Sequence, residues 1–332
     1  MKVLVTGSEG SLMQSVIPYL RDGGCEVRGV DNFFRHGVSR RVRPYEFIQG
    51  DLIERDLARD VTRGIDVVIQ GAAQIFGVTG FHQVPADILA HDVTLHQNLL
   101  WGAKQNGIRR FVYISSSMVY ERCSTVPSRE DHTNDMEVPW TDYGLSKLVG
   151  ERLCRAFQVQ YDLPFTIWRP FNIITPYEKS EGEPGTSHVF ADFIQRIVIN
   201  PERPMRILGD GNQVRCFTWI GDVARAIAKH LTTPESENEV FNLGNPCPVT
   251  MKELAYMIFD RALRKGLIAE DAPLEFLQLP VFDDDVRIRI PAIEKVSTRL
   301  GWKPEVTLEQ ALDLCLVECP NKLHNMLCLA ER

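Results

Sequence analysis

A glycine-rich turn directly after the first apolar run limits the possible folds of this chain more than any other feature. The run 3–5 has the composition of a buried strand, the next residues read Thr6-Gly7-Ser8-Glu9-Gly10-Ser11-Leu12-Met13, and a helical pattern covers 11–20. A strand, a tight turn and a helix in this order aim backbone N–H groups and the positive helix end at a phosphate. The segment therefore predicts an α/β fold that begins with a dinucleotide-binding unit.

The second expected strand ends in an acid, Asp31. A carboxylate at this distance from the turn can accept both hydroxyls of an adenosine ribose. Because an acid there repels the additional phosphate of NADP, we expect NAD as the cofactor.

Short apolar runs alternate with helical patterns through the first half of the chain, which predicts a Rossmann-type, doubly wound parallel sheet. We expect strands at 26–30, 47–48, 66–69, 111–114 and 164–168, and helices at 86–105 and 143–161. Pro and Gly become frequent after Pro170, and 175–186 has a loop composition. We therefore expect an NAD-binding domain over 1–170, with returning segments near 212–245, and a smaller, discontinuous α/β substrate region over 171–332, ending in a loosely attached tail.

Composition excludes several classes of partner. With 332 residues, 44% of them hydrophobic, the chain can bury a sizeable core. A net charge of -7 and scattered arginines argue against nucleic acid. No apolar run approaches the roughly 20 residues that span a bilayer. The eight cysteines form no CxxC and no signal peptide is apparent, so we expect reduced thiols, a cytoplasmic location and no metal site.

A serine-rich segment and a Tyr/Lys pair suggest the chemistry. Ser115-Ser116-Ser117-Met118-Val119-Tyr120 follows the fifth expected strand, and Tyr143-Gly144-Leu145-Ser146-Lys147 begins a helix. Tyr143 and Lys147, four residues apart, share one helix face. A nearby ammonium favours phenolate, which should move the Tyr143 pKa toward neutrality so that it can take a hydroxyl proton, while Ser116 binds the same hydroxyl. We expect Ser116, Tyr143 and Lys147 to be catalytic.

This layout resembles the extended short-chain dehydrogenase/reductase family, in particular its nucleoside-diphosphate-sugar epimerases and dehydratases, over nearly the whole chain. Gly50-Asp51-Leu52 is similar to the family's adenine-contacting turn, and Gly71-Ala72-Ala73 to the strand end beside the cofactor. The resemblance implies that the following residues bind NAD: Gly7, Gly10, Ser11, Leu12, Asp31, Asn32, Asp51, Leu52, Ala72, Ala73, Tyr143 and Lys147.

The resemblance also implies a nucleoside-diphosphate sugar as substrate. The segment that carries an Asn to the substrate phosphates in the family resembles Arg169-Pro170-Phe171-Asn172. The strand that frames the nucleotide resembles Gln213-Val214-Arg215. The family's C-terminal signature resembles Gly301-Trp302-Lys303-Pro304. Arginine suits a diphosphate because its planar fork donates two parallel hydrogen bonds. We favour Arg215 for this role, with Arg287 or Arg289 as a second clamp. The expected substrate-binding residues are Ser117, Asn172, His188, Arg215 and Arg289.

Two residues of the glycine-rich turn depart from the family. Met13 stands where the family has a third glycine, so we expect it to push the helix from the strand or to narrow the pyrophosphate pocket. Glu9 near a diphosphate is favourable only if its side chain points to solvent. The resemblance also implies a homodimer that pairs through helices near 87–105 and 143–160. Leu95, Leu99, Leu148 and Leu153 could supply the apolar contacts, and the alternative is that they lie in the core.

The chemistry after the opening step separates the subfamilies. Dehydratases have an acid where this chain has Met118, which cannot transfer protons, so simple 4-epimerisation is favoured. The stretches around Gly71 and Val119-Tyr120-Glu121 are also similar to GDP-mannose 3,5-epimerase and GDP-fucose synthase, where a Cys replaces Met118 and a second group falls near His188. An imidazole could deprotonate a carbon beside a ketone, or His188 could be a substrate hydrogen-bond donor.

A third hypothesis is a catalytically idle, NAD-binding regulatory protein. Three residues favour this hypothesis: Met13, Glu9 and Asp92. Many relatives have Asn at the position of Asp92. The intact set of Ser116, Tyr143 and Lys147 argues against it.

Overall fold

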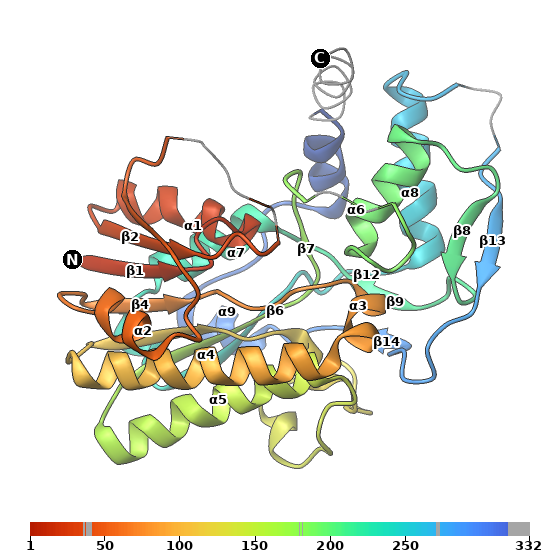
Figure 1. Ribbon diagram of the computed structural model, residues 1–332. Coiled ribbons are helices and arrows are strands. Elements are labelled where there is room, and N and C mark those ends of the chain that lie inside the picture. Colours follow the sequence, from red (N-terminus) through yellow and green to blue (C-terminus); the bar gives the residue numbers. More distant parts are fainter. Residues whose placement is uncertain (36, 38–41, 179, 181, 270–272, 318–332) are drawn as a thin grey trace.

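The structure, a computed structural model, describes residues 1–35, 37, 42–178, 180, 182–269 and 273–317. Within these residues a seven-stranded sheet has the order β11-β6-β5-β4-β1-β2-β3, with all pairs parallel. Helices cover both faces, and a smaller α/β region stands beside the sheet (Figure 1). The predicted Rossmann-type fold is confirmed.

Six strands of the sheet lie within a few residues of the predicted ranges, whereas no strand was predicted at the position of the seventh, β11. Their bounds are β1 (Lys2–Thr6), β2 (Glu26–Asp31), β3 (Glu46–Gln49), β4 (Val67–Gln70), β5 (Arg110–Ile114), β6 (Phe165–Pro170) and β11 (Glu239–Leu243). The central strands are buried on both faces, which explains their continuous apolar runs.

Two helical layers cover the sheet. In Figure 1, α1 (Ser11–Asp22) and α7 (Ile220–Lys229) lie together on one side, and α4 (Pro85–Gln105) and α5 (Asp142–Tyr161) on the other. Successive side chains of β1 alternate between two cores: Val3 and Val5 pack with α1 and α7, whereas Leu4 packs with α4. Beyond residue 212, α7 and β11 thus return to the first domain.

The second region has its own core, formed by helices around two small sheets. Its elements are α6 (Val189–Ile194), the π-helical η3 (Gln195–Ile199), β8 (Met205–Leu208), β9 (Val214–Cys216), β12 (Pro248–Thr250), α8 (Met251–Arg264), β13 (Phe276–Leu279), β14 (Ile288–Arg289) and a helix over 308–317. Smaller elements complete the fold: α2 (Arg55–Val61), α3 (Val78–Gln83), η1 (Ser117–Tyr120), η2 (Glu130–Asn134), β7 (Ile173–Ile174), β10 (Thr218–Trp219), η4 (Pro234–Ser236) and α9 (Glu294–Leu300).

Several further expectations concern single segments. The described residues of 175–186 form neither helix nor strand, as predicted, and the expected tail lies outside the described residues. None of the helices in the described part has both the length and the apolar composition needed to cross a membrane.

Leu95 and Leu99 were expected at a dimer interface, but they are only 3% and 0% exposed and pack in the core with Phe111. That assignment is wrong for these two residues, because the apolar stripe of α4 faces its own sheet.

Candidate active site

One cavity of about 450 Å³ gathers every residue that the sequence proposed for the site. It lies at the carboxyl ends of the parallel strands, where open α/β sheets bind ligands, and its volume suits a small ligand. The lining includes Gly7, Gly10, Ser11, Leu12, Asp31, Asn32, Asp51, Leu52, Ala72, Ala73, Ser116, Ser117, Tyr143, Lys147, Asn172, His188, Arg215 and Arg289.

The expected catalytic residues converge from β5 and α5. Ser116 caps η1, and its hydroxyl accepts a hydrogen bond from the Met118 N–H at 3.1 Å. The Lys147 ammonium donates to the carbonyl of Ile114 at 3.1 Å and lies 5.6 Å from the centroid of the Tyr143 ring. Tyr143 and Lys147 are both buried. The arrangement therefore brings a hydroxyl, a phenol and an ammonium to one wall of the cavity.

The protein groups around Tyr143 raise its pKa. Burial is the main cause and the charge of Asp92 adds to it, while hydrogen bonding to Ser116 opposes them. Burial also lowers the pKa of Lys147, against the charge of Asp92. The direction for Tyr143 differs from the one expected from the sequence, because Lys147 donates to the Ile114 carbonyl and desolvation disfavours phenolate.

Two residues that sequence reasoning missed hold the start of α5. Phe81 on α3 stacks on Tyr143 with ring centroids 4.6 Å apart and planes 9° from parallel. Glu121 accepts hydrogen bonds from the Thr141 N–H at 2.8 Å and its hydroxyl at 2.6 Å, and Thr141 caps α5. Burial raises the pKa of Glu121. No local pattern marks either residue, since each acts through a contact distant in sequence.

The glycine-rich turn fits a pyrophosphate. Gly7 has φ +65°, and a Cβ there would lie 2.9 Å from the Cα of Ala72. Helix α1 begins after Gly10 with no side-chain cap and no acid in its first turn. Its first N–H groups therefore meet the requirement for binding an anion.

The structure shows how the two unusual residues of the turn are accommodated. Met13 is buried in the core, and a Cβ at Gly71 would lie 2.8 Å from its Cγ and Sδ. The missing side chain at Gly71 thus makes room for Met13. Glu9 does not point to solvent: it is 3% exposed and accepts a bidentate ion pair from Arg43. Sequence reasoning missed both partners because they come from other strands and loops.

The acids near the adenosine end are hydrogen-bonded. Asp31 accepts the N–H of Glu9 at 2.9 Å and that of Phe33 at 2.7 Å. Asp51 accepts the Asn32 amide at 3.0 Å and lies 3.3 Å from the His91 ring. These contacts fix the ends of β2 and β3 along one edge of the cavity.

Asp92 is fully buried next to this edge. One of its oxygens accepts the Gln74 N–H at 3.0 Å and contacts His91 at 3.2 Å, whereas the other has no hydrogen-bond partner among the described residues. The charge of Asp92 thus acts on Lys147 and raises its pKa, against the effect of burial.

Two buried arginines face the cavity from adjacent strands. Arg215 of β9 and Arg289 of β14 are partners in the strand register. Burial, and then the charge of Arg289, lower the pKa of Arg215 to about 9. Asp285 lies 3.3 Å from Arg215, and the Nε of Arg289 has no hydrogen-bond partner among the described residues. Two close, desolvated guanidinium groups favour a ligand with at least two negative charges.

The structure separates the two arginines near the C-terminal signature. Arg287 is exposed and pairs with Asp210, whereas Arg289 lines the cavity. Asn172 also lines it, and its amide donates to the carbonyl of Cys216 at 2.9 Å.

His188 forms a pair with a residue that sequence reasoning missed. It caps α6 as predicted for a helix start, and its Nδ1 lies 2.6 Å from Glu178. The charge of Glu178 raises the pKa of His188, and half of the His188 side chain remains exposed. Glu178 lies in a loop whose composition gives no functional signal.

Known proteins are similar to this chain in sequence and in fold. The model of the NAD-dependent epimerase/dehydratase family matches residues 3–244. A UDP-glucuronate 4-epimerase of Thermodesulfobacterium geofontis is 29% identical over 322 residues, 93% of each chain. GDP-mannose 3,5-epimerase of Arabidopsis thaliana is 26% identical over 94% of this chain and 80% of its own.

A solved structure agrees with these matches. The crystal structure of a Thermotoga maritima UDP-glucose 4-epimerase with UDP-glucose has a TM-score of 0.83 and 26% identity, and the match covers 97% of this chain and 100% of that one. The chain belongs to the NAD-dependent epimerase/dehydratase family, with NAD as its cofactor.

Proposed function

We propose that the protein interconverts C4 epimers of a nucleoside-diphosphate sugar through a transient 4-keto intermediate. One observation carries the proposal: two sets of residues line the same cavity. The first set is Ser116, Tyr143 and Lys147, and the second is the buried pair of Arg215 and Arg289. The first set suits proton transfer at a sugar hydroxyl. The second suits a diphosphate. The similarity to 4-epimerases agrees with this assignment.

The residues proposed for NAD lie along the ends of β1 to β4. The turn from Gly7 to Leu12 would hold the pyrophosphate, Asp31 the adenosine ribose, and Asn32, Asp51 and Leu52 the adenine side. The remaining part of the cofactor would lie along four residues: Ala72, Ala73, Tyr143 and Lys147. NAD bound along these residues would supply reversible hydride transfer at C4 of the sugar.

The protein residues handle the proton of the same step. Tyr143 takes the proton of the C4 hydroxyl as the C4–H bond breaks, and Ser116 donates a hydrogen bond to the sugar oxygen. Tyr143 therefore starts this step as the phenolate and ends it as the phenol, and the Lys147 ammonium supplies the positive charge that favours the phenolate. After the ketone turns over, Tyr143 returns its proton to the C4 oxygen as the C4–H bond forms on the opposite face. During these steps the nucleotide is held in place by four residues: Ser117, Asn172, Arg215 and Arg289.

Elimination of water is disfavoured at this site. Met118 lines the cavity at the position where dehydratases have an acid, and its thioether next to Arg289 cannot donate a proton. The site therefore offers one positioned acid–base group at C4, which suffices for 4-epimerisation.

A second candidate is epimerisation at C3 or C5, and the His188–Glu178 pair favours it. A carboxylate on Nδ1 orients an imidazole, as in many acid–base pairs. However, Glu178 raises the pKa of His188, which favours an imidazolium that donates to the substrate over a free base. We therefore assign His188 to substrate binding.

Incubation of the protein with UDP-, GDP-, CDP- and dTDP-sugars in D₂O tests the proposal, with products identified by mass spectrometry and NMR. We expect a C4 epimer without solvent deuterium, because the same hydride leaves and returns. Deuterium at C3 or C5 would support the second candidate. Bound NAD without turnover of any sugar nucleotide would support the idle regulatory protein and refute the enzyme.

A further inference from the structure

The short helix α3 of the first domain contacts two loops of the second region. In Figure 1 it lies where the two regions meet. At the start of the helix, the N–H of Gly77 donates to the Thr186 carbonyl at 3.0 Å, and the N–H of Thr79 donates to the Gly185 carbonyl at 2.9 Å. These bonds attach the beginning of α3 to the loop that precedes α6.

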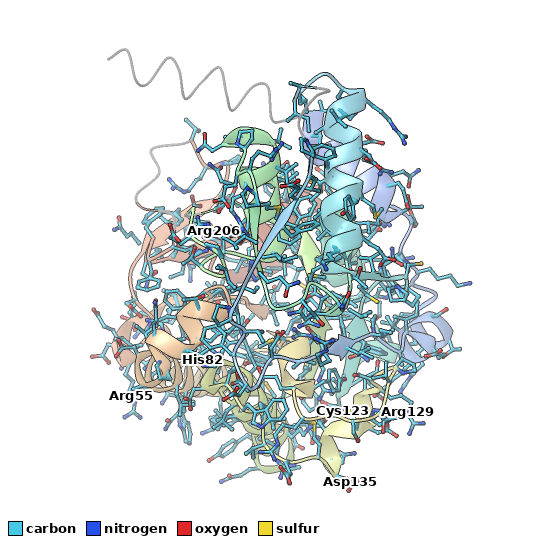
Figure 2. All side chains as sticks on the ribbon, turned by 90° about the vertical axis from the view of Figure 1, so that its right-hand side faces the viewer. Arg55, His82, Cys123, Arg129, Asp135 and Arg206 are labelled. Carbon is cyan, nitrogen blue, oxygen red and sulfur yellow. The ribbon has the colours of Figure 1, made fainter. Side chains whose placement is uncertain are left out.

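The other end of α3 contacts a tight turn over 282–285, which lies between β13 and β14. The Asp285 N–H donates to the Phe282 carbonyl at 3.0 Å and closes this turn. His82, labelled in Figure 2, stacks on Phe282 with ring centroids 3.9 Å apart and planes 18° from parallel. The Nε2 of His82 lies 3.3 Å from Oδ1 of Asp284. One side chain of the first domain thus contacts two residues of the turn.

The same turn also contacts a guanidinium that we propose for substrate binding. Asp285 lies 3.3 Å from Arg215 and accepts a hydrogen bond from the Gln213 amide at 3.1 Å. The adjacent acids of the turn therefore have different partners: Asp284 pairs with the first domain and Asp285 with β9. A guanidinium binds a diphosphate best when its planar fork is already oriented. A shift of the turn away from α3 would disturb the orientation of Arg215.

We propose that His82 is a positioning residue: it holds the turn 282–285 against the first domain and, through Asp285, orients Arg215 for the diphosphate of the substrate. The part that concerns the diphosphate rests on the proposed function, whereas the contact between α3 and the turn does not. Phe81, the residue before His82, stacks on Tyr143. The same helix therefore sets the distance between the diphosphate end of the site and the reacting end.

Ligand affinity tests the inference in the full-length protein with NAD bound. Calorimetry measures the Kd of UDP, UDP-glucose, GDP and GDP-mannose. In His82→Ala we expect the Kd of the preferred diphosphate and of its sugar conjugate to rise alike, by about tenfold, because a charged hydrogen bond is weakened in both. The amount of bound NAD should not change. The matched control is Asp283→Ala, in the exposed neighbour of Asp284, which should leave every Kd unchanged.

Variants of the partner separate this contact from the stability of the fold. Asp284→Ala removes the polar contact from the side of the turn and should raise the same Kd values, so it tests the inference even if His82→Ala does not fold. Asp284→Asn keeps an acceptor oxygen and should restore most of the affinity. The effects of His82→Ala and Asp284→Ala should not add in the double variant, because both remove one contact.

Hydrogen exchange measures the same contact without a substrate. In His82→Ala the backbone over 280–287 should exchange faster than in wild type, whereas α8 should not change. If wild type binds none of the four nucleotides, the proposed substrate class is refuted, and the exchange rates alone decide whether His82 holds the turn. Unchanged exchange and affinity in folded His82→Ala would overturn the inference. So would a loss of affinity for the sugar conjugate alone, because His82 would then contact the sugar directly.

Discussion

At the residue scale, the surroundings of Tyr143 decide what it can do. Burial raises the pKa of Tyr143 and so opposes the phenolate that the proposed step requires, while stacking on Phe81 fixes the ring beside Ser116. In Tyr143→Phe we expect turnover to fall by about 10² to 10⁴, the range for a positioned acid–base group, with the melting temperature little changed. The matched control is Tyr256→Phe on the exposed face of α8. A Tyr143→Phe variant with more than a tenth of wild-type turnover would exclude this role.

His188 gives a second prediction at the same scale, with a defined pH dependence. Since Glu178 raises the pKa of His188, the imidazolium persists above pH 6.5 and is lost as the pH rises through the raised pKa. A charge-assisted hydrogen bond to the substrate disappears with it, so the KM for the sugar nucleotide should rise over that range. His188→Asn should raise KM at low pH, remove this pH dependence and leave kcat nearly unchanged. A collapse of kcat in His188→Asn would instead identify the residue as a base.

At the scale of elements, a buried ion pair joins α5 to the strands that carry the site. Glu151 lies two turns after Tyr143, its carboxylate pairs with Arg169 of β6 at 2.6 Å, and Ser115 at the end of β5 donates to it at 2.6 Å. The two charged side chains are 2% and 0% exposed. Removing one partner leaves the other charged and buried, so the pair constrains how α5 lies against the sheet.

Arg169→Met should therefore lower the free energy of unfolding by about 3 to 5 kcal/mol, measured by urea denaturation. Replacing both partners, in Glu151→Leu with Arg169→Met, should recover much of this loss. Arg129, labelled in Figure 2, offers the control. Its ion pair with Asp131 is exposed, so Arg129→Ala should leave the stability nearly unchanged. Equal effects of Arg169→Met and Arg129→Ala would contradict this account.

At the scale of the whole molecule, α4 and α5 lie side by side on one outer face (Figure 1). The similarity to the family predicts that two copies pair through this face. Light scattering at micromolar concentration should give twice the mass of one chain, and a monomer would contradict the prediction. Because Leu95 and Leu99 face the core, Leu148 and Leu153, which are half-buried, are the remaining apolar candidates from the original set.

The sequence by itself determined the local elements and the residues that act through short spacing. Apolar periodicity predicted six of the seven strands of the main sheet and the helices near 11–20, 86–105 and 143–161, since buried faces need apolar residues at fixed intervals, but it did not predict β11. The turn at Gly7 and the Tyr143 and Lys147 pair were predictable for the same reason: each depends on neighbours within a few residues. Family similarity added Arg215 and Arg289, which no local rule connects.

Only the tertiary structure decided which distant side chains meet. Gly71 makes room for Met13, Arg43 neutralises Glu9, and Glu178 pairs with His188. The short elements α2 and α3 were missed because tertiary packing outweighs weak local preference in short helices. Charge pairing and desolvation depend on distances across the fold, so the electrostatics of the site could not be obtained from spacing along the chain.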